Sequence, residues 1–451
     1  MSLQLPQPFI DSICHCNGFN KDAFIEAHQT ESPVSIRLNP FKPSQLNFEL
    51  KEVVPWAQNA FYLNERPNFT YDIPFQAGCY YVQEAGSMFI EHALKTCVDF
   101  SKTLCALDLC ASPGGKSTLL NSLLNSESVL VANEVVKQRA DTLALNLTKW
   151  GTNQVIVTNN DPSAFKQIQE TFDIILVDAP CSGSGLFRKQ HDAIHEWSLD
   201  NVNLCQQRQK RILSDILDSL NTGGILVYST CSYSAEENEE MLDWLLSQFE
   251  LENIQVPIEN SWNIVETQST LHHAYGYRFY PDKTKSEGFF CAVFKKPGEP
   301  KNTLRKSKKP TFSEINAKDK LNLDVWINDV STHTITTFKE DYLLINPLIL
   351  QFINQFPHLY YKKVGTTIGT KLKNDLVPHH DLAHSIYVSP QIQRIECNYE
   401  EIISFLKKDS LVLNGDKGWN LICHKEHGLG WIKHLGNRIN NYLPNDYRIL
   451  K

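Results

Sequence analysis

Leu107-Asp-Leu-Cys-Ala-Ser-Pro-Gly-Gly-Lys-Ser-Thr118 is the stretch of sequence that decides the fold. Its apolar beginning predicts a short strand, its small residues predict a turn, and Thr118 opens a segment with helical spacing. Such a strand, turn and helix bring backbone N–H groups close to a ligand at the carboxyl end of the strand. The stretch therefore predicts a ligand site at the first turn of an α/β domain.

The same alternation of strands and helices continues on both sides of this stretch, from about residue 79 to residue 295. The expected strands are 106–110, 129–132, 154–158, 172–177, 224–229 and 289–294, and the expected helices are 118–124, 137–150, 206–220 and 241–249. Strands that alternate with helices imply right-handed crossovers. The pattern predicts a Rossmann-like, doubly wound parallel sheet.

The 451 residues are enough for roughly two to four domains. Residues 1–78 are rich in proline and predict a small α+β lobe, and residues 79–296 form the Rossmann-like domain. Residues 297–320 are basic and contain Pro and Gly, which is typical of a linker. Residues 321–451 contain short strands and Gly-rich turns, and we expect a mostly β region there.

Charge is distributed unevenly along the chain, whose formal net charge is -8. Residues 301–451 carry 21 Lys and Arg against 15 Asp and Glu, or +6, and residues 1–300 carry 22 against 36, or -14. An acidic main body offers no general attraction for phosphates, so charge alone favours an ordinary acidic enzyme with a small-molecule substrate. A nucleic-acid partner would have to find local basic surfaces.

The sequence also bears on the compartment. No run of about 18 apolar residues occurs and the first residues do not resemble a signal peptide, so we expect no membrane partner. The 12 Cys show no framework spacing, which favours a reducing cytoplasm.

Two nucleotide-binding motifs are excluded by the sequence of the first turn. A P-loop needs a further glycine where Cys110 and Ala111 stand, and the dinucleotide fingerprint of three spaced glycines is absent. Glu134 follows the second expected strand and can accept ribose hydroxyls, and Asp161 follows the third and can meet an adenine edge. Either acid alone could be an ordinary loop carboxylate, but their order at successive strand ends predicts S-adenosylmethionine as cofactor. The residues expected to hold it are Cys110, Ala111, Ser112, Pro113, Gly114, Gly115, Lys116, Glu134, Asp161 and Asp178.

Two cysteines follow the fourth and fifth expected strands. Cys181 lies in Asp178-Ala-Pro-Cys-Ser-Gly-Ser-Gly185, and Cys231 lies in Ser229-Thr-Cys-Ser-Tyr233. Both could be buried small hydrophobes, but strand carboxyl ends are where open sheets place their ligand crevice. The spacing supports no metal site.

A thiolate beside a methyl donor suggests one chemistry. A thiolate that adds to carbon 6 of a pyrimidine makes carbon 5 nucleophilic enough to accept a methyl group. Asp178 could meet ring nitrogen 3 of a cytosine, and the base would have to leave any stack to reach this crevice. These considerations place Cys181 and Cys231 in one crevice without ranking them.

At this point the sequence resembles the Nop/Sun-type RNA cytosine-5 methyltransferases. The strongest matches are Asp-Leu-Cys-Ala-Ser-Pro-Gly-Gly-Lys at 108–116, Asp-Ala-Pro-Cys-Ser-Gly at 178–183 and Gly-Gly-Ile-Leu-Val-Tyr-Ser-Thr-Cys-Ser at 223–232, with weaker ones at 33–39 and 80–87. The resemblance implies a class I S-adenosylmethionine-dependent methyltransferase domain. It also implies that Cys231 is the nucleophile and Cys181 the release residue, with Asp178 as a further catalytic residue.

Other segments resemble the bacterial branch that methylates small-subunit (16S) ribosomal RNA. These are 185–189 and 195–198, and, in the tail, 369–383 and 430–444, which are similar to a PUA-type RNA-binding domain. The resemblance implies ribosomal RNA or the small ribosomal subunit as partner, bound by the amino-terminal lobe and the carboxyl-terminal region, and a monomeric cytoplasmic enzyme. The tail is expected to position RNA and to add no chemistry.

Three other hypotheses compete with methylation of ribosomal RNA. The same reaction could act on transfer RNA. The chain could be a non-catalytic RNA-binding assembly factor, although that would require a damaged core, and the core acids and both cysteines are present. A small-molecule methyltransferase would not need the basic linker and the additional RNA-type domain.

Overall fold

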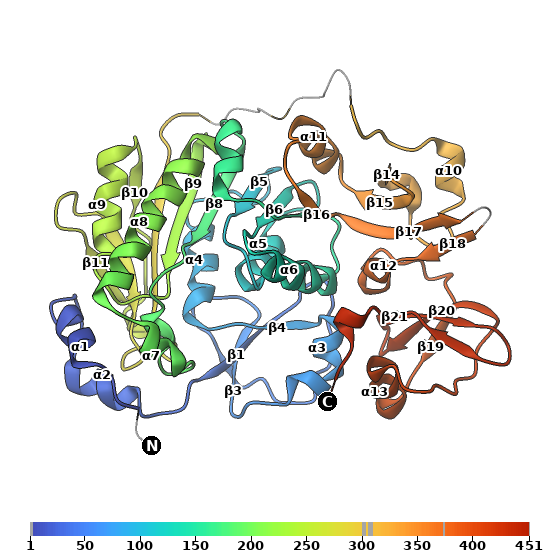
Figure 1. Cartoon of the computed structure of the whole chain (residues 1–451), viewed down its shortest axis with the longest axis horizontal. Helices are drawn as coiled ribbons and strands as arrows, with labels where there is room; N and C mark the ends of the chain where they lie inside the picture. Colours follow the sequence, from blue (N-terminus) through green and yellow to red (C-terminus); the bar gives the residue numbers. More distant parts are fainter. Residues whose placement is uncertain (1–2, 300–303, 305–309, 373–374, 451) are drawn as a thin grey trace.

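The computed structural model, which describes residues 3–299, 304, 310–372 and 375–450, is built around one long mixed sheet (Figure 1). Its strand order is β11-β12-β13-β9-β8-β5-β6-β7-β16, and β10 pairs with β13 off this path. The strands are β5 (Cys105–Asp108), β6 (Val129–Asn133), β7 (Val155–Thr158), β8 (Phe172–Asp178), β9 (Leu220–Thr230), β10 (Glu252–Ile254), β11 (Val265–Gln268), β12 (Tyr275–Phe279), β13 (Phe289–Lys295) and β16 (Tyr361–Val364).

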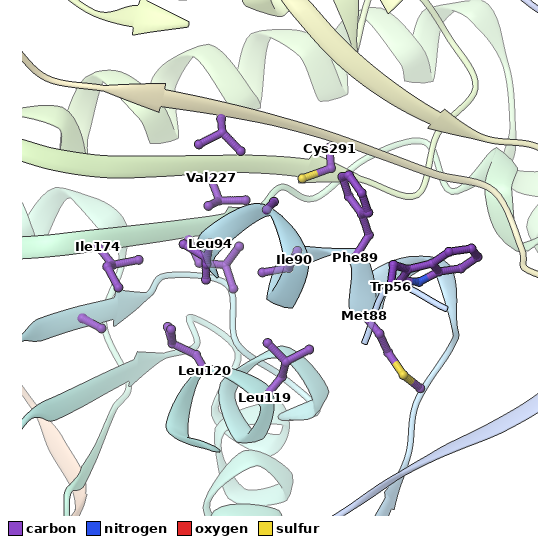
Figure 2. Packing of buried hydrophobic residues seen from close by; sticks show 14 of the residues in the cluster. Trp56, Met88, Phe89, Ile90, Leu94, Leu119, Leu120, Ile174, Val227 and Cys291 are labelled. Atoms are coloured by element: carbon purple, nitrogen blue, oxygen red, sulfur yellow. The ribbon is translucent and has the colours of Figure 1, made fainter. Parts of the chain in front are cut away.

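Helices cover both faces of the five parallel strands, β9, β8, β5, β6 and β7. On one face Leu120 packs with Ile174, as Figure 2 shows, and on the other Leu213 and Leu245 pack with Ile175. The covering helices are α4 (Phe89–Lys95), α5 (Gly115–Leu123), α6 (Lys137–Trp150), α8 (Leu199–Ile216) and α9 (Glu239–Gln248), whereas the short helix α7 (Asp192–Glu196) packs with the amino-terminal helices. The predicted Rossmann-like α/β fold class is confirmed.

The last expected strand runs in the opposite direction to the prediction. β13 is antiparallel to β9, with Phe290 opposite Thr230 and Lys295 opposite Ile225. The chain reaches β13 from its antiparallel neighbour β12, not through a crossover helix, and that connection reverses the direction. The expectation of an entirely parallel sheet is therefore wrong at this edge.

The helix expected at 206–220 is displaced toward the amino terminus. α8 begins at Leu199 because the Ser198 hydroxyl caps it, accepting a hydrogen bond from Asn201 N at 3.1 Å. The expected end overlaps Leu220, where β9 already begins.

The amino-terminal lobe contains a sheet of order β2-β3-β1-β4. Its elements are α1 (Gln7–Ile13), α2 (Lys21–Ala27), β1 (Val34–Leu38), β2 (Glu52–Val53), β3 (Ala60–Leu63), α3 (Ile73–Ala77) and β4 (Tyr80–Val82). Because β4 pairs with β1, this sheet extends past the boundary expected at residue 78. Phe9 and Phe24 of the first two helices pack with Trp197 and Tyr233, so these helices rest on the Rossmann-like domain.

The carboxyl-terminal region forms two four-stranded sheets, of order β14-β15-β17-β18 and β19-β20-β21-β22. Its other strand, β16, joins the central sheet antiparallel to β7, and Phe352 of α11 packs into the core of one face of that sheet. Figure 1 shows this region beside the edge of the sheet that β7 and β16 form. Its elements are α10 (Ala317–Leu321), β14 (Thr334–Phe338), β15 (Asp341–Ile345), α11 (Pro347–Gln355), β17 (Thr366–Leu372), β18 (Asp375–Pro378), α12 (His380–His384), β19 (Arg394–Glu396), α13 (Tyr399–Lys407), β20 (Gly418–His424), β21 (His427–His434) and β22 (Ile439–Asn441).

Within the expected linker, 297–320, residues 300–303 and 305–309 lie outside the described residues, and its last residues already contain the start of α10. The tail motif 369–383 spans β17, β18 and α12, apart from residues 373–374, which also lie outside the described residues. Within the described ranges, no helix is long and apolar enough to cross a membrane.

Candidate active site

The turn after β5 lies at the carboxyl edge of the parallel strands, and Asp108 ends that strand fully buried. Asp108 Oδ2 accepts a hydrogen bond from Ser117 Oγ at 2.6 Å, whereas Oδ1 has no hydrogen-bond partner in the described part of the chain. Burial raises the pKa of Asp108 to about 7. A buried carboxyl oxygen left free at this edge suits an N–H group or a cation of a ligand, because a buried polar atom without a partner is costly.

Two glycines keep this turn narrow. Gly114 has φ 116°, in the left-handed region that glycine adopts without strain. A Cβ atom on Gly115 would lie 3.3 Å from the ring of Tyr81, in β4. The nitrogen of Ala111 donates to the carbonyl of Asn133 at 2.9 Å. The expected cofactor residues 110–116 thus form one continuous segment, a loop that runs into the first turn of α5, held between β4 and β6.

Glu134 lies at the end of β6, beside this loop, and is almost fully buried. Its Oε1 accepts from Val136 N at 3.0 Å, and its Oε2 is 3.3 Å from Nη2 of Arg139. Arg139 also donates to the carbonyl of Ser112 at 3.1 Å and so ties the acid to the loop. The carboxylate keeps acceptor capacity beyond these contacts, as two ribose hydroxyls would require.

Asp161 is the most exposed of the expected acids, and its side chain is 43% accessible. Asn133 holds its loop in place by donating to the carbonyl of Asn160 at 3.0 Å. The carboxylate pairs with Arg211 of α8 at 3.2 Å, a partner that the sequence did not reveal. The structure therefore places Asp161 beside the other residues but engages it in an ion pair.

The sequence prediction also did not include three exposed apolar side chains that lie near Asp161. Val135, Val136 and Tyr360 are 53%, 47% and 60% accessible. Asn159 joins them, because its side chain donates to the carbonyl of Val135 at 3.0 Å and its backbone N donates to the carbonyl of Tyr360 at 3.0 Å. Two β-branched residues directly after Glu134 were a usable signal, but nothing in the sequence pointed to Tyr360.

The two cysteines follow adjacent parallel strands, in which Asp178 lies opposite Ser229. Their sulfur atoms are 3.1 Å apart, although the residues are far apart in the chain. The hydrogen bond to Cys231, together with burial, raises the pKa of Cys181 well above its usual range. Cys181 is therefore a thiol that faces Cys231.

Lys116 connects the loop after β5 to the cysteines. Its Nζ lies 2.8 Å from Asp178 Oδ2, and Asp178 Oδ1 accepts from Ser229 Oγ at 2.9 Å. Burial lowers the pKa of Lys116, but the nearby Asp178 and Cys231 outweigh that effect and raise it above its usual value. The sequence assigned Lys116 to the cofactor alone, whereas the structure pairs its cation with Asp178 and brings it near enough to Cys231 for their charges to interact. Among the described residues, no cluster of His, Cys, Asp and Glu could hold a metal ion.

Family comparisons cover most of the chain. Residues 97–295 match the family described as 16S rRNA methyltransferase RsmB/F, residues 5–85 match the N-terminal domain of 16S rRNA methyltransferase RsmF, and residues 393–449 match the methyltransferase RsmF PUA domain. Curated relatives named ribosomal RNA small subunit methyltransferase F include those of Shewanella sp. (strain W3-18-1) and Shewanella oneidensis. Each is 28% identical, and the matches cover 98% of this chain and 96% and 97% of those proteins.

Solved structures agree with the fold. A methyltransferase homolog from Pyrococcus horikoshii is 32% identical, with a TM-score of 0.55, over 65% of this chain and 96% of that one. NSun6 from the same organism, in a structure with SFG, an S-adenosylmethionine analogue, is 18% identical, with a TM-score of 0.54, over 66% of this chain and 100% of that one. The chain belongs to the RsmB/F methyltransferase family, with S-adenosylmethionine as its cofactor.

Proposed function

We propose that this enzyme forms 5-methylcytosine in 16S ribosomal RNA through a covalent adduct between Cys231 and the base. The observation that carries the proposal is the 3.1 Å separation of the Cys181 and Cys231 sulfur atoms. Two thiols this close, at neighbouring strand ends and beside Lys116 and Asp178, can act on one base. The names of the Shewanella relatives support the small-subunit RNA as substrate.

The cofactor is proposed to lie against residues 110–116. Glu134 accepts the ribose hydroxyls, Asp161 meets the adenine edge beside Val135, and the free oxygen of Asp108 receives the amino group. Bound S-adenosylmethionine supplies an electrophilic methyl group. A charged acceptor such as Glu134 contributes about 1.5–3 kcal/mol through its hydrogen bonds.

Cys231 is proposed as the nucleophile. Its thiolate bonds to carbon 6 of the cytosine, and the electrons of the double bond between carbons 5 and 6 move onto carbon 5, which becomes able to accept a methyl group. Lys116 lies in the same crevice, where its cation pairs with Asp178. Asp178, held by Lys116 and Ser229, takes up the proton that the Cys231 thiol loses and shares it with ring nitrogen 3 of the base, and this proton passes to solvent when the product base forms.

Cys181 is proposed to complete the reaction. The proton on carbon 5 must leave, and the bond between carbon 6 and the Cys231 sulfur must break. Cys181 is hydrogen-bonded to that sulfur and relays the proton to it as it departs. The product base and the free Cys231 thiol are then both restored.

The amino-terminal lobe and the tail are proposed to position RNA. Residues 393–449 match a PUA domain, and residues 301–451 carry the +6 charge excess. Phosphate contacts orient a substrate, while unstacked bases and shape add specificity. We propose a monomer that works in the cytoplasm. The cysteines of the described residues are all free, which supports a reducing compartment.

Transfer RNA methylation is the second candidate, and bisulfite sequencing separates the two. Ribosomal and transfer RNA from a strain that lacks this enzyme are compared with RNA from the parent strain. We expect one protected cytosine of 16S RNA to become convertible in the deletion strain and to regain protection on complementation. Loss of protection confined to transfer RNA would exclude the ribosomal assignment, and no change in either RNA would favour a non-catalytic assembly factor.

The two cysteine roles predict opposite outcomes on denaturing gels. Cys231→Ala should abolish methylation and form no covalent RNA adduct. Cys181→Ala should add to the base, transfer the methyl group and then stall, leaving a protein–RNA band. A trapped band from Cys231→Ala in place of Cys181→Ala would reverse the assignment.

A further inference from the structure

Glu237 is a fully buried carboxylate that contacts the loops of both cysteines. Its Oε1 accepts from Ser182 N at 2.9 Å and from Gln209 Nε2 at 3.1 Å. Its Oε2 accepts from Ser182 Oγ at 2.5 Å and from Ser232 Oγ at 2.6 Å. One rigid side chain therefore links two segments that enter the site from different strands.

The two serines are the residues that directly follow the cysteines, Ser182 after Cys181 and Ser232 after Cys231. Their hydroxyl oxygens are also 3.2 Å apart. A displacement of Glu237 would thus be transmitted through one peptide unit to each sulfur. Because each carboxyl oxygen already accepts two hydrogen bonds, Glu237 has no free acceptor site for a substrate.

Glu237 is itself held firmly. The Tyr228 hydroxyl donates to its carbonyl oxygen at 2.7 Å, and Gln209 of α8 bridges it to the carbonyl of Pro180 at 3.1 Å. The next residue, Asn238, donates to the carbonyl of Ser232 at 2.8 Å. A buried carboxylate is stable only when such donors replace its water.

We propose that Glu237 is a positioning residue that sets the separation of the Cys181 and Cys231 thiols. The proposal rests on the proposed function, in which both thiols act on one base. A misplacement of about 1 Å in a reacting group can slow catalysis by about 100-fold. Glu237 therefore affects turnover through the cysteines, without touching RNA or cofactor.

The first test measures thiol geometry on the full-length protein without RNA. Phenylarsine oxide bridges two thiols only when they lie close together, and mass spectrometry identifies the bridged peptides that contain Cys181 and Cys231. Wild type should form the bridge, whereas Glu237→Ala should lose most of it. Glu237→Gln should keep it, because an amide can still accept from Ser182 N and donate to the two serine hydroxyls. Glu240→Gln, on the exposed side of α9, is the matched control and should bridge fully.

The second test measures methylation of 16S RNA by the same variants. For Glu237→Ala we expect kcat to fall about 10- to 100-fold at unchanged KM for RNA. Glu237→Gln should recover most of that loss, and Glu240→Gln should match wild type. A structural defect alone would not be rescued by the amide while leaving KM constant.

The outcomes separate the two proposals. Glu237→Ala with an intact bridge would overturn the positioning role, whether or not kcat falls. A wild-type protein that forms the bridge but methylates no cytosine would contradict the proposed function and leave the thiol geometry as the measured fact. If Glu237→Ala does not fold, Ser232→Ala leaves Glu237 in place and removes its link to the Cys231 loop, together with the contacts of that hydroxyl with Ser182 Oγ and Ser234 N. It should form less bridge than wild type, and an unchanged yield would overturn the proposal.

Discussion

A chain that ends at Lys296 is expected to lose the stability of its methyltransferase domain, not only its RNA contacts. The cut removes β16 and exposes the edge of β7, where Val364 lies opposite Ile156. It also removes α11 and the segment after it, whose buried side chains belong to the apolar core on one face of the sheet. Those side chains are Ile349, Phe352, Ile353, Phe356 and Leu359.

The magnitude follows from these five side chains. Burial of each contributes about 1.5–3 kcal/mol, so the interface contributes at most about 7–15 kcal/mol. The free energy of unfolding of a typical domain is about 5–15 kcal/mol. The two ranges overlap, and the exposed β7 edge adds a site for aggregation. We therefore expect the shortened chain to be largely insoluble or to melt well below the full chain.

The assay is a comparison of melting temperature and of S-adenosylmethionine affinity by calorimetry. Phe352→Ala in the full chain removes one of the five side chains and should lower the free energy of unfolding by about 3–5 kcal/mol. Phe338→Ala is the control, because that side chain is 44% accessible, and it should change stability little. A chain ending at Lys296 that melts like the full chain and binds the cofactor equally well would refute the reasoning.

Two further changes test the site and the tail. Glu134→Ala should weaken S-adenosylmethionine binding by about 1.5–3 kcal/mol, or roughly 10- to 150-fold. Calorimetry that shows unchanged affinity would exclude Glu134 from the cofactor site. The control is Glu127→Ala, because Glu127 is exposed. Burial lowers the pKa of His380 to about 3, and its Nε2 lies 3.1 Å from that of His384. The unfolded imidazole takes up a proton near pH 6.5 and the folded one does not, so His380 alone should lower stability by about 1.4 kcal/mol per pH unit below 6.5, and burial, which also lowers the pKa of His384, should add to this loss. Urea unfolding at pH 7 and pH 5 measures this loss, which should be smaller in His380→Gln; an identical loss would exclude His380 as its source.

Local sequence patterns were sufficient to predict much of the fold. Apolar runs such as 172–177 and the small-residue turn after Asp108 specify a strand and a loop through neighbouring residues alone, and both are present, although α5 begins at Gly115, three residues before the expected start at Thr118. The rule that parallel strands end at one edge then brought Cys181 and Cys231 together, because each directly follows such a strand. The structure adds a distance of 3.1 Å, which no spacing rule contains.

The remaining features depend on partners that are distant in sequence. The charge of Lys116 looked like part of the cofactor turn, but its Nζ meets Asp178, which is delivered by a different strand. Glu237 looked like one acid among several in Glu236-Glu-Asn-Glu-Glu240, and only the fold reveals that it is buried between Ser182 and Ser232. The predicted strand direction is wrong at β13 for the same reason, because pairing with β12 makes this strand antiparallel despite the strand–helix alternation before it.

The edge strand β16 belongs to the central sheet, although it lies in the expected carboxyl-terminal region, 321–451. Tyr361-Lys-Lys-Val364 is too short and too polar to indicate a partner, and its pairing with β7 is fixed only once the tail has folded back. The preceding residue, Tyr360, is held by Asn160, whose Oδ1 accepts from Tyr360 N at 3.0 Å. Asn160 precedes Asp161, so docking of the tail and the shape of the proposed adenine loop depend on the same hydrogen bonds. The tail therefore supports the proposed cofactor site through structure, while all the catalytic residues that we propose lie before it.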